Sequence, residues 1–224
     1  MSKNVQEGLE HSCWKVRNEA VKALARARAP ENAAQLVAVL EDRRRGPWLK
    51  RLLGEPRRQV GFIRRNAWKG LENQAVPRAC LEILLLEGVT DSYFEVRSQA
   101  WLTLKAQIER ENFRPDPAGV ARLLAVLRRE RNFEVLTNAL QTLPHLVENG
   151  ALEELAPRMV GHSIWKVREA FVNCLARCLE MGRIQHEAAA RLAKLLQPYG
   201  DGFRPVFLLQ DRLRALRQVI EQRA

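Results

Sequence analysis

The stretch that decides the fold is HSCWKVRNEAVKALARA, residues 11–27 of the 224-residue chain. Its first seven residues return almost unchanged as HSIWKVR at 162–168. Counted from Val16, Ala20 and Leu24 follow at offsets of four and eight, which place all three on one side of an α-helix. The repetition indicates either a duplicated His-Ser site or two copies of one structural unit, and the wider pattern favours the second.

The same spacing occurs five times along the chain. Each copy has a β-branched apolar anchor with leucine eight positions later, and four copies have an aromatic residue two positions before the anchor. Second amphipathic segments lie between copies, as at 31–45, 75–88 and 116–130. Internal repetition of paired helices predicts antiparallel hairpins that bury their apolar faces against their neighbours. The five anchors are Val16, Ile63, Val96, Val135 and Val167.

The pattern aromatic-x-Val-Arg-x-x-Ala-x-x-x-Leu resembles that of HEAT repeats, over roughly residues 2–181. The copies depart from it at Gly61, Leu136 and Phe171. The resemblance implies an all-α fold, a right-handed α-solenoid of about five to six HEAT-like helical hairpins. It also implies that the arginine after the anchor is structural, paired with an acidic group or a carbonyl of an adjacent repeat.

The domain organisation follows from this pattern. We expect residues 1–224 to form a single HEAT-repeat domain, with a basic insertion at about 43–61 and a C-terminal capping segment at about 198–224. Prolines at the starts of the second segments fit the first turn of a helix, where the missing N–H costs nothing. These prolines are Pro30, Pro77, Pro117 and Pro157.

Four of the five tryptophans share the register of the repeat. Trp14 and Trp165 precede their anchors by two positions, and Trp68 and Trp101 follow theirs by five. We therefore expect all four in the core. Serines four positions before the anchor are natural N-caps for the second helix of each hairpin. These are Ser12, Ser92 and Ser163.

The segment 43–65 is left over once the repeat is accounted for. It has nine basic residues against one acid, Glu55, in a chain of net charge +11. Glycine and proline on both sides of Trp48 predict an exposed loop with one short helical turn. Such a loop can grasp acidic protein segments or contact phosphates; alternatively it is a solvated insertion whose Trp48 packs back on the body. The candidate partner-binding residues are Arg43, Arg44, Arg45, Trp48, Lys50, Arg51, Arg57, Arg58 and Arg65.

A row of amides and bases on the anchor helices is the second candidate surface. In a solenoid these helices line the concave face. Amides can grip an extended peptide because each offers a donor and an acceptor, although a solvated helix face would have the same composition. The candidates are Asn66, Lys69, Gln99, Asn138 and Gln141.

Motifs for catalysis are weak. HEAT-like deoxyhypusine hydroxylases use several His-Glu pairs to hold iron, and this chain has one, His186-Glu187. HEAT-like alkylpurine DNA glycosylases use an aspartate and tryptophans in the concave channel, where this sequence offers Glu19 and Glu169. The sequence has neither a P-loop nor a dinucleotide-binding glycine motif. The four cysteines form no CxxC pair, so we expect buried thiols rather than a metal site.

The sequence therefore predicts a non-catalytic scaffold or adaptor without catalytic residues, metal or cofactor. Its first expected partner is a protein with an acidic or extended segment, bound by the concave face and the basic loop. DNA or RNA bound through phosphates is the alternative, and a HEAT-like DNA glycosylase is the weaker form of it. The start of the chain lacks the apolar segment of a signal peptide, so we expect a cytoplasmic protein without membrane contact. The identity of the partner and the oligomeric state stay open.

Overall fold

The computed structural model describes residues 3–222, except 28, 30, 148–149 and 201–206. The described residues are helical and contain no β-strand, which confirms the expected all-α class. They divide into two compact units, residues 1–123 and 124–224. The first unit contains α1 (Lys3–Glu10), α2 (Trp14–Ala27), α3 (Asn32–Glu41), α4 (Trp48–Leu52), α5 (Gly61–Leu71), α6 (Arg78–Val89) and α7 (Phe94–Glu109). The second contains α9 (Phe133–Thr142), the 3-10 helix Leu143–His145, α10 (Ala151–Val160), α11 (Trp165–Glu180), α12 (His186–Gly200) and α13 (Phe207–Gln222), and α8 (Pro117–Leu127) spans the boundary.

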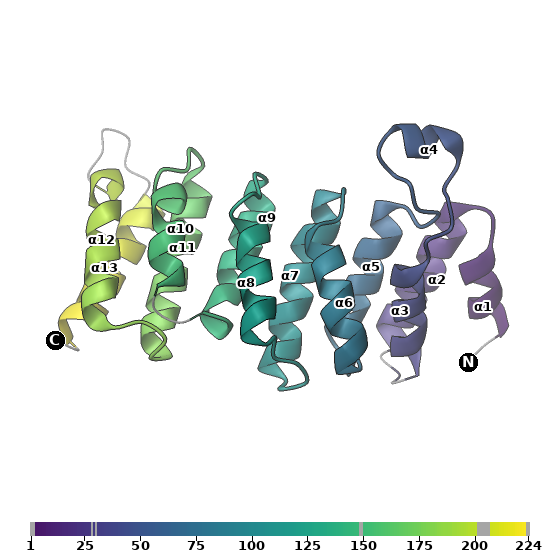
Figure 1. Ribbon diagram of the computed structural model, residues 1–224, viewed down its shortest axis with the longest axis horizontal. Helices are drawn as coiled ribbons and strands as arrows, with labels where there is room; N and C mark the ends of the chain where they lie inside the picture. Colours follow the sequence, from purple (N-terminus) through teal and green to yellow (C-terminus); the bar gives the residue numbers. More distant parts are fainter. Residues whose placement is uncertain (1–2, 28, 30, 148–149, 201–206, 223–224) are drawn as a thin grey trace. The chain divides into compact units, whose positions relative to one another are not determined.

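Each unit is a stack of helical hairpins. In the first, α2 packs against α1, α3 and α5, and α5 packs in turn against α7. Figure 1 shows these helices running alternately up and down. In the second, α11 packs against α9 and α10, and α13 packs against α11 and α12. No described helix has the combination of length and apolar character needed to cross a bilayer.

The repeat pattern sets the core. Four anchors are fully buried (Ile63, Val96, Val135 and Val167), and the leucine eight positions after each anchor is at most 3% exposed. The expectation fails for the first copy, because Val16 is 40% exposed. Only the short α1 precedes α2 in the described chain. It approaches at Ala20, where a Cβ on Gly8 would lie 2.9 Å from the alanine Cβ, and it leaves Val16 uncovered.

The tryptophans divide in the same way. Trp68 and Trp101 are 2% and 1% exposed, as expected for the core. Trp14 is 38% exposed, which corrects the expectation that it is buried, and Trp165 is half-buried. The register therefore predicts burial five positions after the anchor, but not two positions before it, where the helix is only beginning.

Side chains five positions before the anchor cap the turns that lead into the second helices. The Cys13 N–H donates to Nδ1 of His11 (3.0 Å), and the Ile164 N–H donates to Nδ1 of His162 (3.1 Å). Asp91 accepts in the same way from the Tyr93 N–H, at 2.9 Å. This corrects the expectation that the serines are the caps. The duplicated histidines thus have the same capping role in both copies.

The arginine after the anchor closes the same turn. Nη1 of Arg17 donates to the carbonyls of His11 and Ser12, both at 2.8 Å. Arg97 does the same to the carbonyl of Asp91 at 2.8 Å, and Arg168 donates to the carbonyl of His162. The arginine is therefore structural, as the resemblance implied. Besides the carbonyls of their own hairpins, these arginines reach the following repeat, where Arg17 donates to the Arg58 carbonyl and Arg64 to the Asp91 carboxylate.

Gly61 departs from the repeat for a steric reason. A Cβ at this position would lie 2.3 Å from Cδ1 of the Tyr93 ring, so the ring packs directly on the glycine backbone. Phe62, the next residue, supplies the aromatic side chain that the other copies have one position earlier. The other two departures, Leu136 and Phe171, are fully buried apolar residues that fill the core.

The expected proline positions hold in part. Pro77 is the N-cap of α6 and Pro117 is the first residue of α8, as predicted. Pro157 lies inside α10 rather than near its start, and Pro30 lies outside the described residues. The C-terminal segment is helical through Pro198 to Gly200, and residues 201–206 lie outside the described part.

Candidate functional site

The basic insertion between α3 and α5 is a short two-limbed loop with α4 at its tip. Arg45 and Arg57 form an isolated antiparallel bridge, and the Gly46 N–H donates to the Pro56 carbonyl at 2.9 Å. Gly46 is required here, because a Cβ would lie 2.7 Å from the Arg57 carbonyl oxygen. Figure 1 shows the result, with α4 lifted beyond the ends of the neighbouring helices. The predicted exposed loop with one helical turn is confirmed.

Ion pairs fasten one side of the insertion to the α1–α2 turn. Arg44 pairs with Glu10 at 2.9 Å and with Asp42 at 2.8 Å, and Arg58 pairs with Glu10 at 3.0 Å. Hydrogen bonds from Arg44 and Arg58 hold the pKa of Glu10 below its ordinary value. Nη2 of Arg17 also donates to the Arg58 carbonyl, at 3.1 Å. The insertion is therefore held against the first hairpin.

A second set of charges fastens the other side to the C-terminal end of α6. Arg43 pairs with Glu87, and Arg57 lies 3.8 Å from Glu87 and 3.9 Å from Asp91. Burial and the charge of Arg43 lower the pKa of Arg57. Arg64, only 1% exposed, donates two hydrogen bonds of 2.8 Å to the Asp91 carboxylate. These charges lock the base of the insertion.

The internal pairs divide the predicted basic residues into two groups. Arg43, Arg44, Arg57 and Arg58 are used within the protein to hold the insertion in place. The cations nearer the tip are exposed, and among the described residues they form no ion pair. These unpaired cations are Arg45, Lys50 and Arg51.

The tip of the insertion is amphipathic. Trp48, Leu49, Leu52 and Leu53 are 71%, 51%, 75% and 72% exposed. At 100° per residue these four lie on one side of the α4 turn, and Lys50 and Arg51 lie on the other. The alternative in which Trp48 packs back on the body is therefore wrong. We refer to Trp48, Leu49, Lys50, Arg51, Leu52 and Leu53 as the tip.

An aromatic row follows the N-terminal ends of α2, α5 and α7. Trp14 and Phe62 stack with centroids 6.4 Å apart, and Phe62 meets Tyr93 edge-on at 5.4 Å. Phe94 continues the row at 6.1 Å from Tyr93, and the guanidinium of Arg65 lies 5.5 Å from the Phe62 centroid. Sequence reasoning missed Phe62 and Tyr93 as surface residues. The sequence signal for them was Gly61, which stands where the other copies have an aromatic residue.

The predicted amide row is partly structural. Asn66 is 7% exposed and donates to Oδ1 of Asn18 at 2.8 Å, so it joins α5 to α2. Gln99 donates to Glu72, whose pKa burial raises. The exposed member of the row in the first unit is Lys69. In the second unit, Gln141 is exposed and Asn138 is half-buried, with a long hydrogen bond of 3.4 Å between them.

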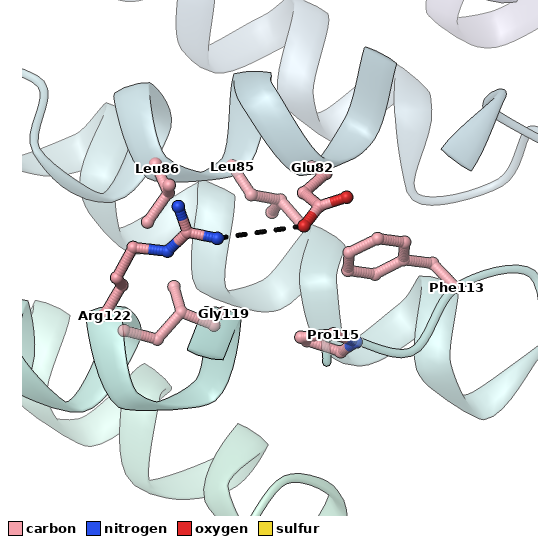
Figure 2. Close-up of a pocket in the computed structure, with 8 residues that line it drawn as sticks. Glu82, Leu85, Leu86, Phe113, Pro115, Gly119 and Arg122 are labelled. Carbon is pink, nitrogen blue, oxygen red and sulfur yellow. Dashed lines mark ion pairs between the residues drawn. The ribbon is translucent and has the colours of Figure 1, made fainter. Parts of the chain in front are cut away.

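The described residues of the first unit line depressions, and two of these adjoin α6. A small apolar one has a volume of about 260 Å³, and an Arg122–Glu82 ion pair of 3.8 Å crosses it. Figure 2 shows this ion pair with Leu85 and Phe113, which bound the depression. A larger one of about 520 Å³ lies beside the insertion and is lined by the paired charges of Arg57 and Arg64 with their carboxylates. The described residues contain no cluster of three or more potential metal ligands.

The cysteines are in contrasting surroundings. Cys174 and Cys178 are buried on one face of α11, and the hydrogen bond that the Cys174 thiol donates to Cys178, together with burial, raises the pKa of Cys174. Cys13 is exposed, against the expectation of a buried thiol. Hydrogen bonds from the backbone N–H groups of Lys15 and Val16 lower its pKa. Cys80 is partly exposed.

Comparison with known proteins identifies the fold. No family model matches the sequence, and no curated protein matches it. Among solved structures, the chain is similar to a designed armadillo repeat protein in complex with the peptide (KR)4, with 15% identity and a TM-score of 0.61. That match covers 98% of this chain and all of the designed one. An engineered protein matches with 15% identity and a TM-score of 0.59, over 99% of this chain and 100% of the other.

Proposed function

Because the chain has the armadillo- and HEAT-like helical-repeat fold, we propose that it is a non-catalytic scaffold that binds a protein partner through an acidic, extended segment. The observation that carries the proposal is the set of cations left free at the basic insertion. Arg45, Lys50 and Arg51 are exposed and unpaired within the described residues, whereas the arginines at the base are neutralised by carboxylates. A rigidly held loop that presents free cations suits a carboxylate-rich ligand.

The complex of the designed armadillo protein supports a charged peptide as the kind of ligand. It is in complex with the basic peptide (KR)4. The present chain has a net charge of +11, so a ligand of the opposite charge is the complementary one. The exposed members of the amide row, Lys69 and Gln141, are in our proposal additional contacts for an extended segment, each within its own unit.

Nucleic acid is the second candidate, favoured by the exposed Trp48 beside Lys50 and Arg51. An aromatic side chain flanked by cations can stack on a base and contact phosphates. The glycosylase form of this idea is weaker, because Trp68 and Trp101 are buried and cannot reach a base. With about three phosphates contacted, the logarithm of the affinity should fall against the logarithm of salt concentration with a slope of about −2 to −3.

A peptide titration tests the proposal. Labelled (DE)4, (KR)4 and a single-stranded DNA are titrated into the protein at low salt. The double variant Lys50→Glu/Arg51→Glu should lower the affinity for (DE)4 at least fivefold, since roughly 0.2–1 kcal/mol is lost per exposed pair and repulsion adds to it. The control Arg78→Glu/Arg114→Glu makes the same change of charge at two other exposed arginines of the first unit.

The outcomes separate the candidates. Binding of (DE)4 in preference to (KR)4, weakened by the tip variant and not by the control, supports the proposal. Equal losses in both variants would show that only net charge matters, and the assignment to the insertion would fall. Binding of DNA with the expected salt slope, and none of (DE)4, would transfer the site to nucleic acid.

A further inference from the structure

We infer that the tip and the aromatic row form one docking surface, and that the acidic segment it binds also carries apolar side chains. The inference rests on the proposed function and deepens it, because it specifies the ligand as acidic and apolar together. Exposed side chains occur in both halves. In the aromatic row Trp14 and Phe62 are 38% and 42% exposed, and at the tip Trp48 and Leu52 are 71% and 75% exposed, so these side chains contribute little to the core.

The two halves lie at the same end of the first unit. The return limb of the insertion is fastened to the α1–α2 turn by Arg58, which pairs with Glu10 and donates to its carbonyl at 2.6 Å. Trp14 begins α2 directly after that turn, and Phe62 stacks on it. Figure 1 shows α4 beyond this end of the helices, where α2 and α5 begin. One extended segment could therefore contact both halves.

The aromatic row has the features of an interface anchor. Its rings hold each other in place by stacking, and Tyr93 is fixed on the backbone of Gly61, so little side-chain freedom is lost on binding. Tryptophan, tyrosine and arginine side chains are enriched where partners bind most strongly, and Trp14, Tyr93 and Arg65 belong to or adjoin the row. Exposed apolar surface of this kind would otherwise be an aggregation hazard.

The charges of the surface specify the ligand. Lys15 is exposed beside Trp14, Arg65 lies over Phe62, and Lys50 and Arg51 lie on the side of the α4 turn opposite its leucines. Carboxylates complement these cations, and aliphatic side chains complement the rings and leucines. A planar bilayer would meet the protruding tip first, whereas a polypeptide segment can follow the surface from the tip to the row. The arrangement therefore favours a protein ligand over a lipid one.

Two acidic peptides test the inference, (DE)4 and the leucine-containing (DEL)4. Wild-type protein should bind (DEL)4 at least tenfold more tightly than (DE)4. That gain should fall below threefold in Phe62→Ser, which alters the row, and in Leu52→Ser/Leu53→Ser, which alters the tip. It should persist in the control Ile83→Ser, because Ile83 is 67% exposed, lies on α6 and belongs to neither half. Circular dichroism of each variant establishes that it is folded, and the tip variant removes no buried side chain.

The failures are distinguishable. If neither peptide binds, the proposed function falls, and the inference falls with it. If (DE)4 binds but leucine adds nothing, or if the gain survives both variants, only the inference is overturned. Sedimentation with phosphatidylcholine vesicles, with and without phosphatidylserine, covers the lipid alternative. Binding to the anionic vesicles that is lost in Leu52→Ser/Leu53→Ser, with no leucine gain, would assign the tip to membranes instead.

Discussion

Replacing Gly61 by alanine tests the packing that orders the aromatic row. A Cβ at this position would lie 2.3 Å from Cδ1 and 2.4 Å from Cγ of Tyr93, where ordinary contacts are 3.4–4 Å. The ring must therefore move by roughly 1 Å, and because Cγ lies on the Cβ–Cγ axis, rotation of the ring about that bond cannot relieve the clash. Overpacking of this kind costs about 1–3 kcal/mol, against a helix-propensity gain of at most about 1 kcal/mol for alanine.

We therefore expect Gly61→Ala to lower the free energy of unfolding by about 1–2 kcal/mol in urea denaturation. In a Tyr93→Ala background the same change should be neutral or stabilising, so the two substitutions should show a coupling energy of about 1–3 kcal/mol. Gly150→Ala is the control, because nothing lies within 4 Å of the position its Cβ would take. A stabilising Gly61→Ala in wild type, or a loss that persists without the Tyr93 ring, would refute the reasoning.

Three further predictions concern the core, the charges and a thiol. Leu104→Ala, at a fully buried repeat position, should destabilise by about 2–5 kcal/mol in urea, and an unchanged midpoint would contradict the register. Arg64→Ala should cost about 3–5 kcal/mol because it strands the buried Asp91 carboxylate, and Arg64→Ala/Asp91→Ala should regain part of that loss. Because its pKa is lowered, Cys13 should react with iodoacetamide at lower pH than a free thiol, whereas Cys174, buried and with a raised pKa, should react only on unfolding. Mass spectrometry of the alkylated peptides measures both rates, and a Cys13 midpoint at or above that of free cysteine would be inconsistent with the N–H contacts.

The sequence predicted where the candidate site lies, but not which of its arginines form ion pairs within the protein. The sequence locates the basic insertion and its short helical turn, because glycine and proline interrupt the helical period locally. It could not show that Arg58 and Glu10, 48 residues apart, pair with each other. It also could not show that Asn66 is buried and hydrogen-bonded to Asn18, since the linear pattern places both amides at surface positions.

The sequence by itself determines the helices, their hairpin pairing and most of the core. Periodicity suffices for this, because offsets of four and eight place the anchors and leucines on one helix face wherever they occur. Only the tertiary structure decides that Trp14 and Trp165, which lie in nearly identical heptads, differ in exposure. It alone also decides that the α4 leucines face solvent. The physical reason is that burial depends on which neighbour covers a side chain. In the described part of the chain only α1 precedes the first copy, and the paired limbs of the insertion carry α4 beyond the ends of the neighbouring helices (Figure 1).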